Sequence, residues 1–299
     1  MIGEISTSSA RRQIRIQLFG KGWLNHYDAN RTALPSVFWP LIGLVATASD
    51  QRISRTRLAG ELWPESDEAS ARHCLASALW RIRTALPAGA VLLNATSDWI
   101  ALARGHRLWV DAVAFDIRLK RALAAPERLM DSAERHRLAQ ALALYRNAFL
   151  RECDHPWAGL QRERLRTLYL DGLYELAIAE CRVGNWGAAQ QHARAVCAEE
   201  PLREDGHRLL MTAYARCGNR AMALQQYRRC QSVLADDLGV APMPETTALF
   251  DDIARRSGAS QTAPDGHGDL VQIRHELAEV LARIDQHISR TGPSPQSAI

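Results

Sequence analysis

The sequence has no run of about 18 uncharged apolar residues, the length that a helix needs to cross a membrane. Its first residues, MIGEISTSSARRQ, also lack the apolar segment that a secretory signal peptide requires. Both absences argue against insertion into a membrane and against export. We therefore expect a cytoplasmic protein with no membrane partner.

Motifs of catalysis and of metal binding are also missing. The six cysteines show no disulfide framework, so we expect reduced thiols. Cys153 and His155 form a close pair, but no second Cys/His pair has the spacing of metal ligands. No G-x-S-x-G, H-E-x-x-H, phosphate-loop or dinucleotide-binding motif is present. We predict no catalytic residue, no metal and no cofactor, and hence a protein that is not an enzyme.

Positive charge is concentrated near the N-terminus. Residues 1–110 hold 13 Lys and Arg against 8 Asp and Glu, whereas the whole chain has a net charge of +4. A basic first third is what a polyanion-binding domain requires, although an excess of this size also occurs on ordinary solvated surfaces.

The first third also carries the element order of a winged helix-turn-helix. Hydrophobic periodicity and turn residues predict a strand at 13–19, helices at 35–49, 54–64 and 68–86, and two strands within 90–103 joined near Asn94–Asp98. The 35–49 helix is expected to start after Pro40 or to be disrupted there. Ser54 is expected to cap the second helix and Pro64 to end it.

The third helix has two contrasting faces. Leu75, Leu79, Ile82 and Leu86 are spaced to form one buried stripe. A second face carries Arg72, Ala76, Trp80 and Arg83, and no Asp or Glu occurs from residue 69 to 86. Such a face suits a DNA groove, and a solvated basic face on an ordinary amphipathic helix explains it equally well. For Trp80 we favour packing within the protein over packing on DNA.

From residue 110 onward the pattern is almost entirely helical and contains a repeat. ELAIAECRVGNWGAA (175–189) matches LLMTAYARCGNRAMA (209–223) at an offset of 34 residues. This period, with Gly-Asn at the turn and small residues where helices cross, is typical of tetratricopeptide repeats. Segments 139–150 and 162–176 are predicted to add further helices.

The C-terminal part has a different composition. A turn with two prolines and a closing helix are expected over 236–255, followed by a flexible linker. Residues 269–288 place Leu270, Ile273, Leu277, Val280 and Ile284 at coiled-coil spacing. We expect this helix to form a homodimer or to dock on the repeats.

Three stretches give the chain a resemblance to a known family. RLAGELWPESDEASARHCLASALWRIRTAL (57–86) resembles the winged helix of bacterial activators of the antibiotic-regulatory-protein type, and VDAVAF (110–115) resembles the hinge that opens their bacterial transcriptional activator domain. Residues 184–242 resemble the core of that domain closely. The resemblance implies a DNA-binding transcription regulator, an activator that binds promoter repeats in double-stranded DNA and contacts RNA polymerase.

The resemblance also implies which residues face DNA. Carried over by position, they are Arg72, His73, Ala76, Ser77, Trp80, Arg81 and Arg83 of the third helix, with Arg55 and Arg57 near phosphate. The chain departs from the family pattern at the wing, where SDWIAL replaces the usual Gly-Tyr pair, and at the first helix, where FWPLIG replaces an Arg-rich entry.

The predicted fold class is mainly α, with an N-terminal winged helix-turn-helix and an all-α tetratricopeptide-like domain. The expected division is 1–109 for DNA binding, 110–256 for the activator domain, 257–268 for the linker, 269–290 for the C-terminal helix and 291–299 for a disordered tail. The alternative is a protein-interaction scaffold whose degenerate winged helix does not bind DNA. Steep salt dependence distinguishes DNA binding from an apolar peptide groove.

Overall fold

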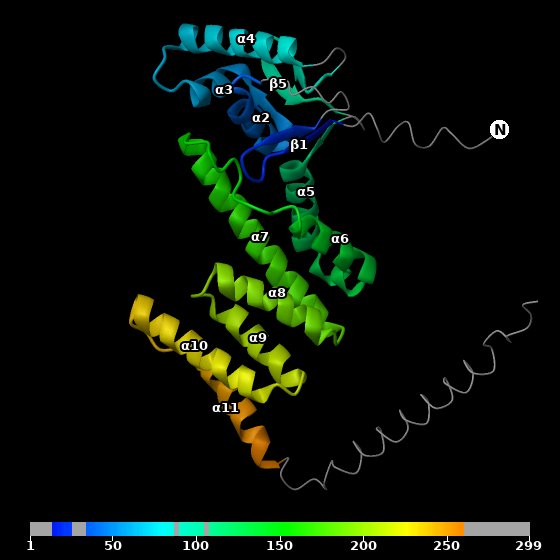
Figure 1. The fold of residues 1–299 in the computed structure, drawn as a ribbon, viewed down its shortest axis with the longest axis vertical. Coiled ribbons are helices and arrows are strands. Elements are labelled where there is room, and N and C mark those ends of the chain that lie inside the picture. Colours follow the sequence, from blue (N-terminus) through cyan, green and yellow to red (C-terminus); the bar gives the residue numbers. More distant parts are fainter. Residues whose placement is uncertain (1–13, 26–33, 87–89, 105–107, 260–299) are drawn as a thin grey trace, which may run out of the picture. The chain divides into compact units, whose positions relative to one another are not determined.

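The computed structural model describes residues 14–25, 34–86, 90–104 and 108–259. Helices dominate, and two small sheets lie in the N-terminal part (Figure 1), so the predicted fold class is confirmed. All six cysteines lie in the described ranges and none forms a disulfide. A search of the same ranges finds no helix with the length and apolarity of a membrane span.

The N-terminal part, called the head below, consists of the described residues up to Val110. Its elements are β1 (Ile14–Gln17), β2 (Trp23–Asn25), α2 (Phe38–Thr47), a 3-10 turn (Ser49–Gln51), β3 (Arg52–Ser54), α3 (Arg55–Leu62), α4 (Glu68–Ala85), β4 (Leu93–Ala95), β5 (Trp99–Leu102) and β6 (Leu108–Val110). The strands form two sheets with the orders β2-β1-β6 and β3-β5-β4. The predicted first strand, three helices and hairpin are confirmed.

The start of α2 differs from the prediction. The helix begins at Phe38, so Pro40 lies in its first turn rather than before it. The N–H groups of a first helical turn have no partner inside the helix, and a proline there loses no hydrogen bond. Phe38, Leu41 and Ile42 are fully buried. The apolar FWPLIG sequence therefore serves the core of the head.

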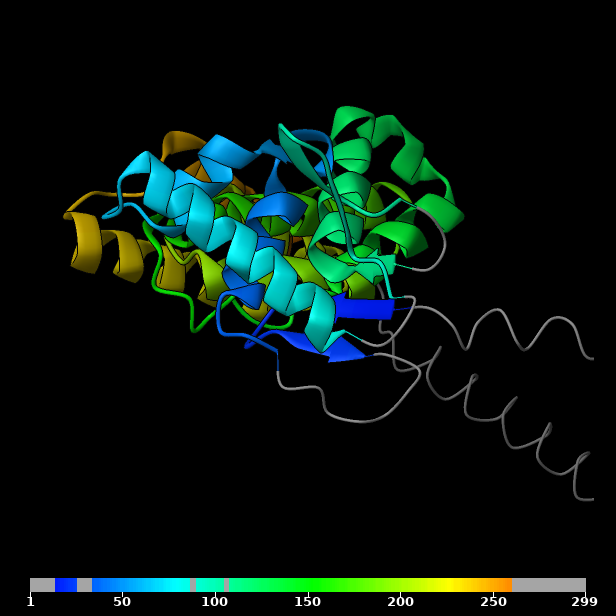
Figure 2. The same cartoon turned by 90° about the horizontal axis from the view of Figure 1, so that it is seen from above.

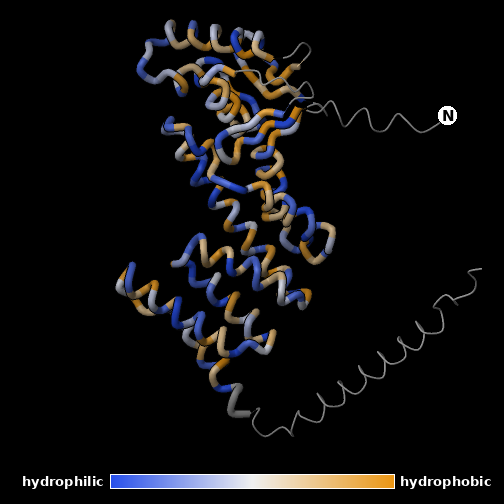
Figure 3. Tube along the Cα trace, in the orientation of Figure 1, coloured by the Kyte–Doolittle hydropathy of each residue, from blue (hydrophilic) through white to orange (hydrophobic). Residues whose placement is uncertain are grey.

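The remaining elements are helices. They are α5 (Asp111–Ala124), a 3-10 turn (Pro126–Met130), α6 (Ser132–Leu142), α7 (Pro156–Arg182), α8 (Trp186–Glu199), α9 (Glu204–Arg216), α10 (Arg220–Leu238) and α11 (Pro244–Ala259). Figure 3 shows hydrophobic and hydrophilic residues alternating along α8, α9 and α10, as expected of helices with one buried side.

Two predicted segments are corrected by these boundaries. The predicted helix at 139–150 is wrong beyond Leu142, because the following residues turn back toward β1. The expected linker at 257–268 begins too early, since α11 continues to Ala259. The predicted helix at 269–290 and the tail at 291–299 lie outside the described residues.

The 34-residue repeat is confirmed in the backbone. Gly184 and Gly218, equivalent in the two copies, both have left-handed φ angles, of 77° and 75°. In both turns the N–H of the following asparagine, Asn185 or Asn219, donates to the carbonyl five residues earlier, at 2.8 and 2.9 Å. The turn that joins the two helices of each pair therefore requires a left-handed backbone conformation, which favours glycine.

Small side chains allow these helices to pack closely. Four alanines at equivalent repeat positions are buried, with exposed fractions of 3% or less: Ala179, Ala213, Ala189 and Ala223. Helix α8 packs against both α7 and α9, and α9 packs against α10. The stacking buries an apolar side that no single helix pair could bury alone.

The segment that joins the head to the helices is buried. The carboxylate of Asp111 accepts hydrogen bonds from the backbone N–H groups of Leu18 (2.7 Å), Phe19 (3.2 Å) and Ala112 (2.7 Å). Burial raises the pKa of Asp111, and the three hydrogen bonds oppose that rise. The hinge expected at 110–115 is therefore a fixed junction between the end of β1 and the start of α5.

Backbone contacts extend this junction. The Leu150 N–H donates to the Leu18 carbonyl (2.7 Å), and the Gly20 N–H donates to the Ala148 carbonyl (3.0 Å). Arg162 of α7 donates from Nε to the Phe149 carbonyl (2.8 Å) and from Nη2 to the Leu150 carbonyl (2.7 Å). The segment predicted as helix thus pairs with the chain that follows β1.

We expect Asp111→Ala to lower the free energy of unfolding by roughly 3 kcal/mol, since it leaves two or more buried N–H groups without an acceptor. Chemical denaturation of the full chain measures the change. Asp111→Asn keeps one acceptor oxygen and should cost less, and Asp154→Ala, at an exposed position, should cost little. Equal stability of Asp111→Ala and Asp154→Ala would contradict the junction.

A buried histidine lies between the repeat helices. The His207 Nε2–H donates to the Pro201 carbonyl, and Nδ1 accepts from the Gln226 amide, both at 2.9 Å. Burial lowers the pKa of His207 from its ordinary value of 6.5. Folding therefore favours the neutral imidazole.

The imidazole of His207 binds a proton more readily in the unfolded chain than in the folded one. The free energy of unfolding should therefore decrease as the pH falls below about 6.5. The decrease should grow as the pH falls from 6.5 toward the lower pKa of the folded state. Denaturation at several pH values measures it. The His207→Gln variant should lose this part of the pH dependence, whereas His73→Gln, at an exposed position, should retain it. Identical profiles for both variants would refute the assignment.

Candidate nucleic-acid interface

Helix α4 starts at a well-formed N-cap. The Asp67 carboxylate accepts from the backbone N–H groups of Ala69 and Ser70, both at 3.0 Å, and from the Ser70 hydroxyl at 2.7 Å. The Ser70 backbone N–H, followed by the Ser70 hydroxyl, lowers the pKa of Asp67 below its usual value. The cap fixes where the helix begins and hence which residues face outward.

The inner side of α4 packs chiefly on α3. Ala71, Leu75, Ala78 and Ile82 are its buried residues. Of the stripe predicted from the sequence, Leu75 and Ile82 are confirmed as buried, whereas Leu79 and Leu86 are only half-buried against the core. The apolar side of α4 is therefore narrower than expected, and more of its circumference is open to solvent.

The outer side holds the predicted DNA-facing residues. Six of the seven on α4 are exposed, and Ser77 is half-buried: Arg72, His73, Ala76, Ser77, Trp80, Arg81 and Arg83. Trp80 is 66% exposed, so the expectation that it packs within the protein is wrong. In Figures 1 and 2, α4 lies on the outside of the head. No described residue seals this face.

The arginines of this face differ in their partners. Arg72 is hydrogen-bonded to Glu68, one turn earlier, which neutralises part of its charge. The side chains of Arg81 and Arg83 make no hydrogen bond or ion pair with any described residue. The Glu68–Arg72 pair could have been recognised from the i,i+4 spacing. Most of the unpaired positive charge of α4 therefore lies in its last two turns.

A shallow hollow of about 510 Å³ lies at the middle of this face. Its lining consists of Ala76, Ser77, Trp80 and Arg81. The small side chain of Ala76 leaves space between the Trp80 ring and the preceding turn. The hollow offers an apolar surface, a hydroxyl and a cation, which together suit the edge of a base or a sugar-phosphate backbone.

Arg55 and Arg57 begin α3, and their surroundings differ. Ser54 caps the helix, accepting from the Arg57 N–H at 3.3 Å, as predicted. The Arg55 backbone N–H donates to the Asp98 carbonyl (2.9 Å), and its guanidinium donates to the Thr96 carbonyl (3.2 Å). Arg57 is exposed, with Glu61 at 4.0 Å. Arg55 thus ties α3 to the wing, and Arg57 is the more available cation.

A basic residue that sequence reasoning missed lies beside the wing, the hairpin of β4 and β5. The guanidinium of Arg52, on β3, stacks over the ring of Trp99 on β5 at 4.2 Å from the ring centroid. Strand β3 has only three residues and was not predicted, so nothing in the sequence placed Arg52 beside the wing. Trp99 is 40% exposed, and this pair adds a cation and an aromatic ring to the wing's surface.

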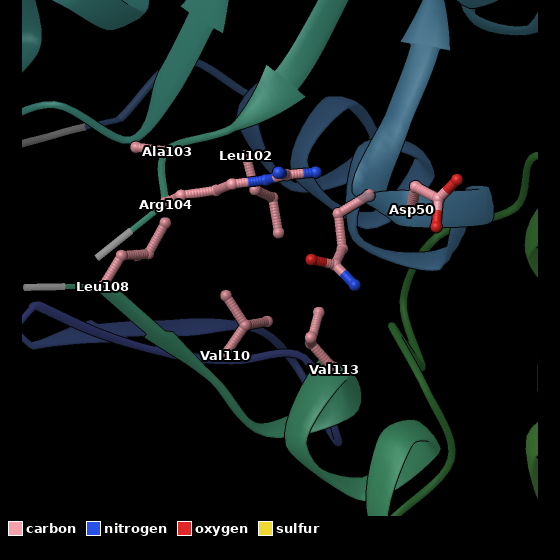
Figure 4. Close-up of a pocket in the computed structure, with 8 residues that line it drawn as sticks. Asp50, Leu102, Ala103, Arg104, Leu108, Val110 and Val113 are labelled. Atoms are coloured by element: carbon pink, nitrogen blue, oxygen red, sulfur yellow. The ribbon is translucent and has the colours of Figure 1, made fainter. Parts of the chain in front are cut away.

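A second hollow, of about 340 Å³, lies between the head's two sheets and α5 (Figure 4). Its lining combines Asp50 and Arg104 with apolar side chains such as Leu102 and Val110. Asp50 and Gln51 have left-handed φ angles of 55° and 51°, a strained conformation for residues other than glycine. Within the described ranges, no three His, Cys, Asp or Glu residues are grouped as metal ligands would be.

The comparisons with known proteins agree with this arrangement. Residues 110–254 match the family profile of the bacterial transcriptional activator domain. Over 218 residues the chain is 29% identical to the regulatory protein AfsR of Streptomyces griseus, covering 70% of this chain and 22% of that protein. AfsR of Streptomyces coelicolor is 32% identical over 210 residues, 64% of this chain and 20% of that protein.

Mycobacterial proteins give a similar result. The chain is 29% identical over 208 residues to the transcriptional regulatory protein EmbR of Mycobacterium tuberculosis, covering 65% of this chain and 51% of EmbR. The solved structure of Mycobacterium tuberculosis EmbR in complex with a low-affinity phosphopeptide superposes with a TM-score of 0.68 at 21% identity, covering 90% of this chain and 71% of that one. The chain spans about a fifth to a half of these curated relatives.

The cap of α3 can be tested by Ser54→Ala. Losing the bond to the Arg57 N–H should lower the free energy of unfolding by about 1 kcal/mol. Thermal or chemical denaturation provides the measurement, with Ser66→Ala at an exposed turn position as the control. If both variants were equally stable, the start of α3 would not depend on this cap.

Proposed function

We propose that the chain belongs to the family that carries the bacterial transcriptional activator domain, as its resemblance to the antibiotic-regulatory-protein type of regulators implied, and that it is a sequence-specific DNA-binding activator of transcription. One observation carries the proposal. The outer side of α4 presents Arg81 and Arg83 without ion-pair partners among the described residues, beside an exposed Trp80, on a winged helix whose α4 stands free of the repeats.

In this proposal α4 enters the major groove of double-stranded DNA. Arg72, His73, Ala76, Ser77, Trp80, Arg81 and Arg83 contact bases or backbone. Arg57 contacts phosphate, and Arg55 chiefly holds the wing in place. The wing, with Arg52 and Trp99, lies near the adjacent minor groove.

The rest of the chain acts after DNA binding. Residues 110–256 form the activator domain and offer a surface for RNA polymerase, while residues 1–109 bind the promoter. Helix α11 closes this body at Ala259. The linker then begins after α11 and leads to the helix at 269–290, which pairs with a second protomer, and 291–299 form a tail. The protein acts in the cytoplasm by recruitment, without catalysis or cofactor. The names of the relatives, which are regulatory proteins, support this role.

The alternative is a protein-interaction scaffold with a degenerate winged helix. The wing's sequence favours it, since Asp98 lies at the tip and its carboxylate accepts from the Ser97 hydroxyl at 3.1 Å. A carboxylate near a phosphate backbone is unfavourable. Binding measurements on the head decide between the two functions.

Ala76 provides the sharpest test, because it is exposed in the middle of the α4 face. Ala76→Glu places a carboxylate where DNA would lie, whereas Ala76→Gln adds nearly the same volume without charge. Both substitutions suit a helix. We expect Ala76→Glu to lower affinity for a DNA fragment selected from a random library by at least about tenfold relative to Ala76→Gln, measured by fluorescence polarisation.

Arginine removal adds a quantitative check. Arg83→Ala or Arg72→Ala should weaken binding by about 1–3 kcal/mol if the side chain contacts a base edge. Arg182→Ala, an exposed arginine on α7, is the matched control. Affinity should also fall steeply between 50 and 200 mM salt, by roughly a thousandfold for six phosphate contacts. Unchanged binding by all α4 variants, with the fold intact, would favour the scaffold.

A further inference from the structure

The repeats contain a groove that the proposed DNA interface does not use. It has a volume of about 670 Å³ and is lined by residues of α8, α9 and α10. Its lining is mixed: apolar side chains from Leu210 and Met222, amides from Gln225 and Gln226, and three arginines, Arg194, Arg228 and Arg229. No Asp or Glu lines it. The groove is thus basic and partly apolar.

The cations of the groove are available to a ligand. All three arginines are exposed, and Arg228 and Arg229 make no ion pair with a described residue. Arg194 donates from Nε to the Tyr214 hydroxyl at 2.9 Å, and its guanidinium lies 5.3 Å from the Tyr214 ring centroid. Tyr214 therefore orients Arg194 and leaves its two terminal nitrogens free to donate.

The repeat presents part of this chemistry twice. Arg194 and Arg228 are separated by 34 residues, and so are Gln191 and Gln225. Because the repeat has the same period, each second helix of a pair carries Gln-x-x-Arg at the same position. Equivalent arginines of α8 and α10, the second helices of the two pairs, therefore line the same groove, where they can contact acidic groups spaced along a chain.

The inner lining of the groove is apolar and carries no reactive thiolate. Burial raises the pKa of the Cys197 thiol to about 12, so it remains protonated at neutral pH. Gln226 is held by its bond to His207. Met222 is 42% exposed, and its flexible side chain can adapt to a partner. Apolar contact at the inner lining suits a peptide, whereas duplex DNA would meet only the arginine rim.

We propose that this groove binds an acidic peptide segment of a partner protein. Carboxylates of the segment pair with Arg194, Arg228 and Arg229, and an apolar side chain of the segment packs on Met222 and Leu210. Charge complementarity selects this partner, since three arginines and no described Asp or Glu line the groove. The inference goes beyond the proposed DNA binding and does not depend on it.

The test uses the full chain and a fluorescein-labelled peptide of 16 Glu, Leu and Ala residues, with a second peptide in which Gln replaces every Glu. Fluorescence polarisation should detect binding of the first peptide and much weaker binding of the second. Arg228→Ala/Arg229→Ala should raise the dissociation constant by about tenfold or more, because charge-assisted hydrogen bonds are lost. Arg182→Ala, on α7 outside the groove, should leave it unchanged.

Three results would overturn the proposal. The first is equal binding of the Glu and Gln peptides. The second is equal affinity of the groove variant and the Arg182→Ala control. The third is stronger displacement of the probe by a synthetic peptide of residues 269–288, or by duplex DNA, than by the unlabelled Glu peptide. The groove variant should also keep the DNA affinity of the unmodified chain, which separates this inference from the proposed function.

Discussion

The buried carboxylate of Asp111 is the contact on which the arrangement of the head and the following helices depends. It accepts hydrogen bonds from the backbone N–H groups of Leu18 and Phe19, which follow β1. Asp111 itself lies in the first turn of α5. Around it, Phe19 meets Phe115 and Tyr145 edge-on, with ring centroids 5.1 and 5.0 Å apart. One continuous hydrophobic core therefore includes β1 and the start of the repeats. The winged helix is thus packed directly against the helices that follow it.

That junction explains why the outer side of α4 can remain open. The core of the head is filled by α2, the strands and the inner sides of α3 and α4, and α5 attaches through β1 and β6. Helix α4 is thus needed for packing on only one side. Its other side keeps exposed cations and an exposed tryptophan, which a solvated surface does not require. In the groove of the repeats, Arg228 and Arg229 likewise have no ion pair with a described residue.

Much of this architecture could be predicted from the sequence. Periodicity identified the helices and the hairpin, and the 34-residue offset identified the turns at Gly184 and Gly218, because these features depend on local geometry. The three-residue strands β2, β3 and β6 were not predicted, since their pairing depends on distant segments. For the same reason the position of Arg52, on β3, was not predicted. The end of α6 was misjudged because the residues after Leu142 pair with the chain beyond β1. The nine candidate DNA-facing residues come from the sequence. The partner of Arg72 follows from the i,i+4 spacing to Glu68, whereas the partners of Arg55 emerged only in three dimensions.

The central claim is that the outer side of α4 enters a groove of duplex DNA. Hydroxyl-radical labelling of the full chain, read by mass spectrometry with and without the selected DNA fragment, tests it most directly. Trp80, 66% exposed, should lose most of its labelling when DNA is bound, whereas Trp23, 51% exposed on β2, should keep it. Unchanged labelling of Trp80 in a saturated complex would contradict the account.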